Sequence, residues 1–431
     1  MRASFKTVDI TGSIGLRLSG YTERDHGNEG IHDPVEANIA VIESGEEYMV
    51  IVAIDAVGID LPGCKDIRQK VSEQTPIKPQ NILFSATHTH ASYQAIRYGA
   101  EGFIIDMLHE PRMGETDAAY YELYKAKLVG AIVWAYESLE PVKAGYGRTT
   151  LEGLGSNRND PQGYDDHSVN VLKFERTDGT LAGTLVNFGC HPTVLPWQNY
   201  LVSADYPGYT RRLVEEVFPG STLVFLQGAS GGASTRFTRQ KNGYAEAERF
   251  GYMLGGETIK SVCQIACQDV EWPIQAALTD LVLKVRDFPS DEELLQGIED
   301  VTNEKKRLED THADPKLIRK QYVTLQGATR NYRMKQFIDV PEWTTEVQII
   351  RLGDFNFVTI PGEPFAEIGR DIKAHYGDNT FVCGYANDYV GYLVSNEGLH
   401  TEGYELFMTP FNEETHDRIV AAAIEAGHHL A

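Results

Sequence analysis

The stretch Asn81-Ile-Leu-Phe-Ser-Ala-Thr-His-Thr-His90 shows how this chain builds its sheet and where it places polar side chains. An apolar run of strand length leads directly into His88 and His90. In an extended segment residues i and i+2 share one face, so both imidazoles are able to reach one ion. Metal binding or catalysis is one interpretation of this pair, and two surface histidines at a strand end are the other.

Four other apolar runs end in the same way, in a short loop rich in polar residues. They are Leu185–His191, which is followed by Pro192, Thr222–Arg236 with its Gly/Ser loop, Phe355–Glu363, and Phe381–Tyr392. In α/β proteins the loops at strand ends are where functional sites are built. The pattern therefore predicts one site that is assembled from several strand ends.

Each loop also has an ordinary structural interpretation. His191 is either a ligand or a core histidine with satisfied hydrogen bonds, and Glu363 is either a ligand or a first-turn acid of a helix. The tyrosines between residues 381 and 392 are either site residues or core tyrosines whose hydroxyls have partners. The loop Gly228-Ala-Ser-Gly-Gly232 can offer backbone N–H groups to an oxyanion, but it continues as loop rather than as the helix of a nucleophile elbow.

Strand-like and helical patterns alternate along the chain, which is typical of an α/β protein with a mixed β-sheet core and helices packed on its faces. The expected strands are Met49–Val57, Asn81–Ala86, Val169–Phe174, Leu181–Phe188, Thr222–Leu226, Gln275–Val285, Glu346–Leu352, Phe355–Ile360 and Thr380–Tyr385. The expected helices are Asp66–Glu73, Asp117–Leu139, Tyr206–Val217, Ala245–Ala266, Asp291–Glu309, Pro315–Tyr332, Phe365–His375 and Asn412–Ala426.

One pair of expected helices forms a hairpin that turns at Ala313-Asp314-Pro315, and we expect it to be an insertion over residues 290–335. No linker rich in Pro, Gly or Ser divides the chain into two halves. Residues 1–431 are therefore expected to form a single catalytic domain.

Composition excludes several classes of protein. The 431 residues have a mean hydropathy of -0.31, and no run approaches the roughly 18 apolar residues of a membrane span. Aromatic residues make up 10% of the chain and are spread along it, which excludes a disordered protein. The formal net charge of -23 opposes binding to nucleic acid or to anionic lipid headgroups. We expect a small-molecule substrate, no nucleic-acid partner and no stable membrane insertion.

The cellular compartment is indicated by two weaker features. The five cysteines form no dense disulfide framework. The first residues, Met-Arg-Ala-Ser-Phe-Lys, lack the apolar region of a signal peptide. Both features favour a cytoplasmic location.

The residue types at the strand ends suit Zn²⁺, which takes nitrogen and oxygen ligands and keeps one open position in catalytic sites. Two ends carry histidines, one carries a glutamate, and tyrosines lie close by in sequence. The sequence contains neither an HExxH motif nor paired CxxC motifs.

Several ordered motifs resemble the catalytic domain of neutral (non-lysosomal) ceramidases and of their shorter bacterial relatives. The motifs are Gly20-Tyr21, His32-Asp33-Pro34, Thr87-His-Thr-His90, Ala386-Asn-Asp-Tyr-Val-Gly-Tyr392 and Tyr404-Glu405. The resemblance implies a zinc-dependent amidase of sphingolipid metabolism. It also implies a short member of the family that lacks the C-terminal immunoglobulin-like domain of full ceramidases.

The resemblance also assigns roles to individual residues. The zinc ligands that it implies are His88, His191, Glu363 and Tyr392. The catalytic residues that it implies are Ser234, His90, Tyr404 and Arg158. The residues that it implies for substrate binding are Gly20, Arg158 and Tyr404.

The sequence departs from the family pattern in two loops. The family's serine loop reads Gly-Asp-Val-Ser-Pro-Asn, whereas this chain has Gly231-Gly-Ala-Ser-Thr-Arg236. His90 is followed by Ala91-Ser-Tyr93 rather than by a glycine- and proline-rich turn. Three functions remain open at this point: ceramidase-like hydrolysis of an N-acyl amide, hydrolysis of an ester or glycosidic bond in a soluble substrate by the same metal site, and metal-stabilised binding without catalysis.

Overall fold

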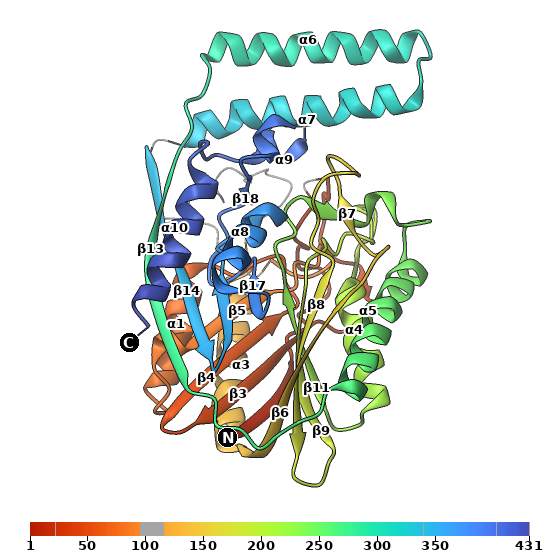
Figure 1. The fold of residues 1–431 in the computed structure, drawn as a ribbon. Coiled ribbons are helices and arrows are strands. Elements are labelled where there is room, and N and C mark those ends of the chain that lie inside the picture. Colours follow the sequence, from red (N-terminus) through yellow and green to blue (C-terminus); the bar gives the residue numbers. More distant parts are fainter. Residues whose placement is uncertain (22, 95–115, 339, 402, 431) are drawn as a thin grey trace.

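The fold is built on a mixed eight-stranded sheet, shown in the computed structural model of Figure 1, which describes every residue except 22, 95–115, 339, 402 and 431. The strand order is β11-β9-β8-β6-β1-β3-β4-β5. In chain order the strands are β1 Arg2–Asp9, β3 Glu36–Ser44, β4 Glu47–Ile54, β5 Ile82–Ala86, β6 Glu140–Thr150, β8 Ser168–Arg176, β9 Leu181–Phe188 and β11 Thr222–Gln227. The pairs β4–β5 and β9–β11 are parallel, and the other pairs of this sheet are antiparallel.

A second sheet of four strands lies against the first. Its order is β13-β14-β15-β17, with β13 at Ile274–Lys284, β14 at Glu342–Leu352, β15 at Phe355–Thr359 and β17 at Thr380–Cys383. One hydrophobic cluster contains buried side chains from both sheets, including Met49 and Ile51 of β4 with Phe357 of β15 and Phe381 of β17. The two sheets therefore bury one face of each against the other.

Helices cover the outer faces of both sheets, so the domain has four layers (Figure 1). The helices α1 (Leu61–Ser72) and α3 (Ala118–Glu137) pack on the half of the large sheet that contains β3, β4 and β5. Helices α4 (Asp205–Val217) and α5 (Tyr244–Gln264) cover the half that contains β8, β9 and β11. Helices α8 (Ala366–Tyr376) and α10 (Thr415–His428) pack on the smaller sheet.

The expected helical hairpin is confirmed as α6 (Asp291–Asp310) and α7 (Pro315–Phe337), which extend beyond the sheets at one end of the molecule in Figure 1. A capping box of Ser290 and Glu293 begins α6. Helix α7 packs against the short helix α9 (Tyr404–Met408). A Cβ placed on Gly327 of α7 would lie 2.9 Å from Phe407, so the absence of a side chain allows this close approach.

The remaining short elements connect loops at the strand ends. Three two-stranded pairs join β2 to β10, β7 to β12 and β16 to β18. Their bounds are β2 Gly30–Ile31, β7 Ser156–Asn157, β10 Leu201–Val202, β12 Ala233–Ser234, β16 Glu363–Pro364 and β18 Tyr392–Leu393. Three short 3₁₀ turns are η1 Pro79–Asn81, η2 Thr235–Phe237 and η3 Gly398–His400.

The predicted mixed α/β fold is correct, and β9 has the predicted bounds. The prediction omitted β1, β3 and β6 because their sequences carry charged residues or glycines within the run, as in the segment Glu140–Thr150. Helix α1 begins five residues earlier than expected, at Leu61. The segment Leu61-Pro-Gly-Cys contains two residues that disfavour a helix interior, but Pro is tolerated in a first turn, and Asp60 caps it by accepting from the Gly63 N–H.

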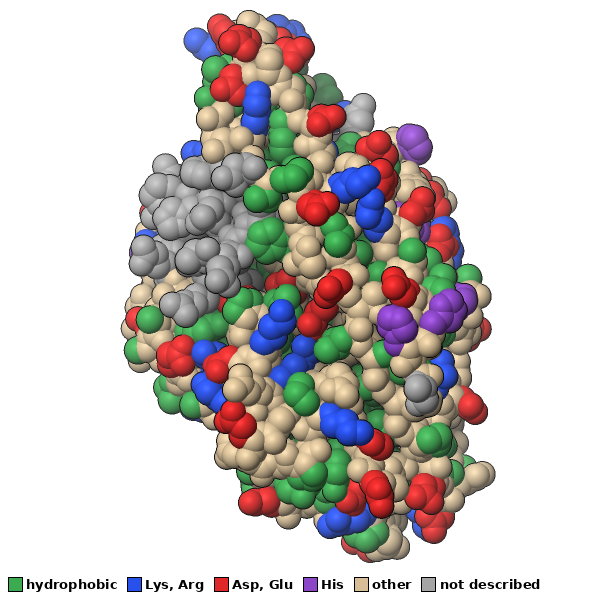
Figure 2. All heavy atoms as spheres, turned by 90° about the vertical axis from the view of Figure 1, so that its left-hand side faces the viewer, with side chains coloured by type: hydrophobic (Ala, Val, Ile, Leu, Met, Phe, Trp, Pro, Cys, Tyr) green, Lys and Arg blue, Asp and Glu red, His purple; other side chains and the backbone are tan. Residues whose placement is uncertain are grey.

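No helix among the described residues combines the length and the apolar character needed to cross a membrane. Acidic and basic side chains alternate on the face shown in Figure 2, without a broad basic area over its described residues.

His167, which lies just before β8, is expected to make the stability of the fold depend on pH. The nearby Asp165 raises its pKa, burial opposes the rise, and Glu152 adds to it, so the pKa is about 9 instead of the usual 6.5. The charged ring therefore stabilises the fold fully below about pH 6.5, and this contribution is lost as the pH rises through about 9.

The substitution His167→Gln should lower the free energy of unfolding by about 1–2 kcal/mol at about pH 6, after allowance for partial exposure, and by much less at about pH 10. Urea denaturation at both pH values measures this difference. The exposed His375 on α8 provides the control, His375→Gln. A difference that stays constant across the pH range would contradict the prediction.

Candidate metal centre

Three imidazoles meet at the strand ends. They come from two of the loops in which the sequence predicted a site: His88 and His90 from one, and His191 from the other. The candidate ligand atoms of His88, His90 and His191 all lie within 4.8 Å of one another. The Nε2 atom of His88 is 3.0 Å from Nε2 of His191 and 3.1 Å from Nε2 of His90. His88 and His191 are buried, and His90 is half-buried.

Hydrogen bonds at the far side of two rings determine their tautomers. Nδ1 of His88 lies 2.6 Å from the Val57 carbonyl oxygen, and Nδ1 of His191 lies 2.8 Å from the Ser230 carbonyl oxygen. A carbonyl only accepts, so each Nδ1 carries the proton that is donated. In the neutral rings both Nε2 atoms are then lone-pair acceptors, and they face each other across 3.0 Å.

Glu363 adds a carboxylate to the same point. Its Oε2 atom lies 3.0 Å from Nε2 of His191 and 3.4 Å from Nε2 of His88. This oxygen is buried and has no hydrogen-bond partner among the described residues, whereas Oε1 accepts from the Tyr389 hydroxyl at 2.5 Å. Within the group of His88, His191 and Glu363, these buried acceptors face one another with no proton between them, which is unfavourable, and a positive charge between them would stabilise the group.

A metal ion fits this requirement better than a proton does. One proton on one imidazole satisfies one acceptor, whereas a cation between the groups contacts all of them. The second-layer bonds from Nδ1 to backbone carbonyls are also those that metal-binding histidines commonly make. The residues present therefore fit a divalent metal ion that prefers nitrogen and oxygen ligands.

Burial keeps the histidines in the form that binds metal. Burial lowers the pKa of His191 to about 4, and the positive Arg158 contributes to the shift. Burial and the other two histidines also lower the pKa of His90 well below its usual value. Burial alone would raise the pKa of Glu363, but the adjacent His88 and His191 hold it well below the usual range. The group therefore offers His90 and His191 as neutral imidazoles and Glu363 as an ionised carboxylate at neutral pH.

Left-handed backbone at the loop positions directs these side chains inward. His88, Tyr385 and Asn387 have φ values of 67°, 53° and 61°. Such values are uncommon for residues other than glycine and persist where the surroundings impose them. Here the His88 N–H donates to the Ala56 carbonyl, and the Asn387 side chain accepts from the Phe84 N–H.

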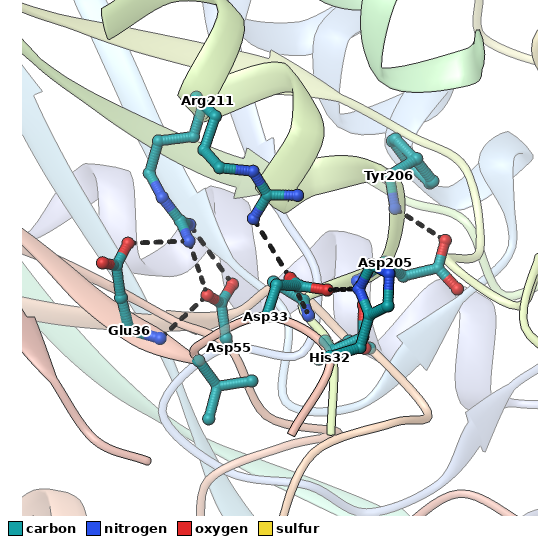
Figure 3. A network of polar contacts seen from close by, with 12 residues as sticks. His32, Asp33, Glu36, Asp55, Asp205, Tyr206 and Arg211 are labelled. Atoms are coloured by element: carbon teal, nitrogen blue, oxygen red, sulfur yellow. Dashed lines mark hydrogen bonds and ion pairs between the residues drawn. The ribbon is translucent and has the colours of Figure 1, made fainter. Parts of the chain in front are cut away.

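A buried charge network anchors the strand ends beneath His88 (Figure 3). Arg211 of α4 donates to Asp55, directly after β4, at 2.9 Å and pairs with Glu36 of β3 at 2.9 Å. Asp55 also accepts from the Thr87 hydroxyl at 3.2 Å. The network therefore joins β3, β4 and α4 to the residue that precedes His88.

The other predicted ligand, Tyr392, lies beside this group. Tyr392 is the register partner of Glu363 in the short parallel β16–β18 pair. Its ring is stacked with the His191 ring at a centroid distance of 6.4 Å. The backbone thus places Tyr392 next to two predicted ligands, and its role as a ligand stays a prediction.

Arg158 and Tyr404 lie on the other side of Tyr392. The Arg158 guanidinium is 5.4 Å from the centre of the Tyr392 ring, and its Nε lies 2.7 Å from a carboxylate oxygen of Glu405. The Tyr404 ring meets the Tyr392 ring edge-on at 6.3 Å. The Tyr404 hydroxyl accepts a hydrogen bond from Arg330 of α7 at 2.6 Å, so the helical hairpin also reaches the site.

Ser234 and Gly20 complete the set that the sequence predicted. Ser234 is buried and forms an isolated parallel bridge with His191. Gly20 has a φ of 93°, and a Cβ at this position would lie 2.4 Å from Cγ of the His90 ring. The His90 ring therefore packs on the Gly20 backbone, where any larger residue would displace it.

Two residues with site contacts were not singled out from the sequence. Tyr389 donates to Glu363, and Tyr385 stacks on His88 at 4.0 Å while its hydroxyl lies 2.9 Å from Ser230 Oγ. The tyrosine-rich stretch was the available signal. The sequence does not tell which of its hydroxyls meets the carboxylate, because the turn after β17 determines their directions.

The family of the chain follows from comparison with known proteins. The sequence model described as "Neutral/alkaline non-lysosomal ceramidase, N-terminal" matches residues 4–228. The chain belongs to this family. The match contains His88, His90 and His191, and it confirms the resemblance that was drawn from the motifs.

Individual ceramidases match the chain more distantly. Neutral ceramidase A of Dictyostelium discoideum is 27% identical over 240 residues, which cover 50% of this chain and 32% of that protein. The neutral ceramidase of Mycobacterium tuberculosis is 21% identical over 242 residues, 50% of this chain and 36% of that protein. The aligned segments thus span about a third of these curated relatives.

The crystal structure of neutral ceramidase from Pseudomonas aeruginosa shares the fold. It matches with a TM-score of 0.74 and 19% identity, covering 100% of this chain and 75% of that chain. The fold match extends over Glu363 and Tyr392, which lie beyond the segment matched by the family's sequence model.

Protein purified without chelator should contain about one divalent metal ion per chain. The substitutions His88→Ala, His191→Ala and Glu363→Gln should each remove most of it, because each deletes one of the converging acceptors. The control His375→Ala should retain the metal. Elemental analysis measures the content, and a native protein without metal, or a His88→Ala variant with full content, would contradict the assignment.

Tyr389→Phe should weaken metal affinity about 10–100-fold, because Glu363 loses the hydroxyl that orients its carboxylate. Competition with a chromogenic chelator measures the affinity. Tyr252→Phe is the matched control, since Tyr252 also donates to a glutamate, Glu248, but on the exposed surface of α5. Equal affinity of the two variants would show that Tyr389 does not orient the ligand.

Proposed function

We propose that the protein is a zinc-dependent hydrolase that cleaves the amide bond of an N-acylated substrate. One observation carries the proposal: the Nε2 lone pairs of His88 and His191 and the ionised Glu363 carboxylate converge on one point with no proton between them. Membership of the neutral/alkaline ceramidase family supports the amide as the target bond. The relatives named above are ceramidases, and ceramide is an N-acyl amide.

Zinc is the ion that suits this donor set best. His88, His191 and Glu363 supply nitrogen and oxygen ligands, and Tyr392 is placed beside them as a fourth. Zinc bound there would polarise a substrate carbonyl and lower the pKa of a bound water.

Tyr404 is placed to donate a proton to a developing oxyanion. Its hydroxyl oxygen accepts from Arg330, so its own O–H proton is directed elsewhere. Each donor that is preorganised towards a developing negative charge stabilises the transition state by about 3 kcal/mol. Burial raises the pKa of the Tyr404 hydroxyl, and the positive charge of Arg330 opposes this rise, so the hydroxyl carries its proton at neutral pH.

His90 is the second candidate donor. Its Nδ1 atom is buried and has no hydrogen-bond partner among the described residues. Burial keeps the ring neutral, so one of its nitrogens carries a proton and is able to donate it.

Ser234 is better placed for chemistry than Ser230. The Ser234 hydroxyl accepts from the Arg236 N–H at 3.3 Å, which leaves its proton available. The Ser230 hydroxyl is paired with Tyr385 at 2.9 Å, and its carbonyl accepts from His191. Ser234 is therefore our candidate for the nucleophile or the group that positions it, and Ser230 supports His191.

Arg158 holds the serine loop in place. Its Nη2 donates to the Gly231 carbonyl at 2.5 Å, and its Nε is paired with Glu405. Because a carboxylate already balances its charge, Arg158 orients the loop and Tyr392 rather than supplying a free positive charge to the substrate.

The purified protein should hydrolyse N-acyl amides, lose this activity with a chelator and regain it when zinc is added. A panel of N-acyl lipids, N-acyl amino acids, matched esters and glycosides tests the bond. Product release measured by mass spectrometry gives the rates. Hydrolysis of esters or glycosides without amide hydrolysis, or activity that a chelator leaves unchanged, would reject the proposal.

Ser234→Ala should lower kcat about 10²-fold or more with metal retained, which is roughly 2.7 kcal/mol of transition-state stabilisation. Ser230→Ala should lower kcat less, because its hydroxyl is engaged with Tyr385. Steady-state kinetics on the best amide measures both variants. An unchanged kcat in Ser234→Ala would exclude this hydroxyl from the chemistry.

A further inference from the structure

Three arginines next to the candidate site have no acidic partner. They are Arg24, Arg236 and Arg239, which we call the arginine arc. None of them forms an ion pair with a carboxylate among the described residues, and none has a further unassigned contact. Acidic residues outnumber basic ones by 62 to 39 in this chain, so unpaired arginines gathered at one place need an explanation.

Backbone contacts attach each arginine to a loop of the site. Arg24 donates to the carbonyl oxygen of His90 at 2.6 Å, and Arg239 donates to that of Thr193, two residues after His191, at 2.9 Å. Arg236 donates to the carbonyl oxygen of Arg158 at 3.3 Å. Carbonyl groups satisfy hydrogen bonds but do not neutralise charge, so three positive charges remain at the site.

Tyr21 and the segment after His191 connect the members of the arc. The Arg24 guanidinium lies 4.9 Å from the centre of the Tyr21 ring, whose hydroxyl donates to the Leu195 carbonyl at 2.9 Å. The Tyr21 ring in turn meets the His90 ring edge-on at 4.8 Å. Arg239 contacts the same segment at Thr193, and Arg24 donates to the Trp197 carbonyl at 3.3 Å, so both arginines contact one short loop.

Arg24 is the most unusual of the three. It is 2% exposed, and its Nη2 atom is buried without a hydrogen-bond partner among the described residues. Burial lowers its pKa to about 10. Burying a cation without a carboxylate partner is unfavourable, and a bound anion would offset this cost.

Arg236 lies close to two other arginines. Surrounding protein lowers its pKa through burial, and repulsion from Arg158 and Arg239 adds to the shift, with Glu405 opposing it. Its side chain is exposed to water. An exposed guanidinium beside Arg239 is accessible to an anion from solvent, and the neighbouring charge adds to the attraction.

The nearby carboxylates are engaged with other groups. Glu405 is paired with Arg158, and Asp205 accepts from the backbone N–H groups of Leu195 and Tyr206. Glu23 accepts from Gln326 of α7 at 2.9 Å. Of these three carboxylates Glu405 is balanced by a cation. Glu23 and Asp205 keep their negative charge, but these contacts are with neutral donors and not with the three arginines of the arc.

We propose that the arginine arc binds an anionic group of the substrate, so that the preferred amide carries a carboxylate instead of being neutral. This inference rests on the proposed amide hydrolysis and names the substrate class for it. Arginine suits this task because its planar guanidinium binds carboxylates through two parallel hydrogen bonds. The anion belongs either to the amine half or to the acyl half of the amide, and different probes distinguish the two.

The test compares matched amides. N-dodecanoylglycine carries its carboxylate on the amine half, and N-dodecanoylglycinamide is its neutral counterpart. The N-ethyl monoamide of dodecanedioic acid carries the carboxylate on the acyl half, and N-ethyldodecanamide is neutral. In the pair whose carboxylate reaches the arc, kcat/KM of the anionic amide should exceed that of its neutral counterpart about tenfold or more. A tenfold difference corresponds to roughly 1.4 kcal/mol.

The double variant Arg236→Gln/Arg239→Gln should lower this preference about tenfold, mainly through KM, because the positive charge acts on binding. Raising the salt from about 0.05 M to about 0.5 M should also reduce the preference of the native protein. Arg307→Gln on α6 is the control, since Arg307 is exposed and paired with Glu304. A native preference for the neutral amides, or a double variant with an unchanged preference, would overturn the inference.

A binding measurement separates this inference from the proposed function. If no amide is hydrolysed, the proposed function fails, and calorimetry with both anionic amides, N-dodecanoylglycine and the N-ethyl monoamide of dodecanedioic acid, still decides about the arc. Binding to the native protein that is about tenfold tighter than to the double variant supports the arc. Equal binding, or no binding to either protein, rejects it.

Discussion

The site depends on a buried cluster of acceptors that repel one another. Two imidazole Nε2 atoms and one Glu363 oxygen lie 3.0–3.4 Å apart in the protein interior. Their Nδ1 protons are committed to backbone carbonyls, so the rings cannot turn to relieve the contact without losing those bonds. A cation between the groups would stabilise this arrangement. The hydrogen bonds and ion pairs of the surrounding loops keep the three groups close together.

The four-layer architecture supplies that support. Strands β5 and β9 of the large sheet deliver His88 and His191, and the turn after β15 delivers Glu363. Because the two sheets pack face to face, strand ends from both sheets meet at one end of the domain. The buried Arg211 network and the left-handed backbone at His88 fix the loops there, and some conformational strain is concentrated at the site.

The arginines around the cluster are of two kinds, those paired with a carboxylate and those bound by backbone carbonyls. Arg158 is balanced by Glu405 and serves the geometry of the serine loop. The arginines of the arc are bound only by carbonyls and retain their charge. In a strongly acidic chain, this arrangement is the basis of our proposal that the substrate is anionic. Family membership supports the proposed chemistry of the centre, whereas its neighbouring charges bear on what it would recognise.

The sequence by itself determined the α/β class, the helical hairpin, most strand positions and the loops that carry His88, His191 and Glu363, because hydrophobic periodicity and strand-end polar residues are local signals. It did not reveal β1, β3 and β6, whose charged residues and glycines are compatible with strands only after neighbouring strands pair with them. Nor did it distinguish Tyr389 from the other tyrosines or show the carbonyl-bound arginines. Those depend on tertiary structure, because the directions of turns and the partners of buried charges are set by segments far apart in the chain.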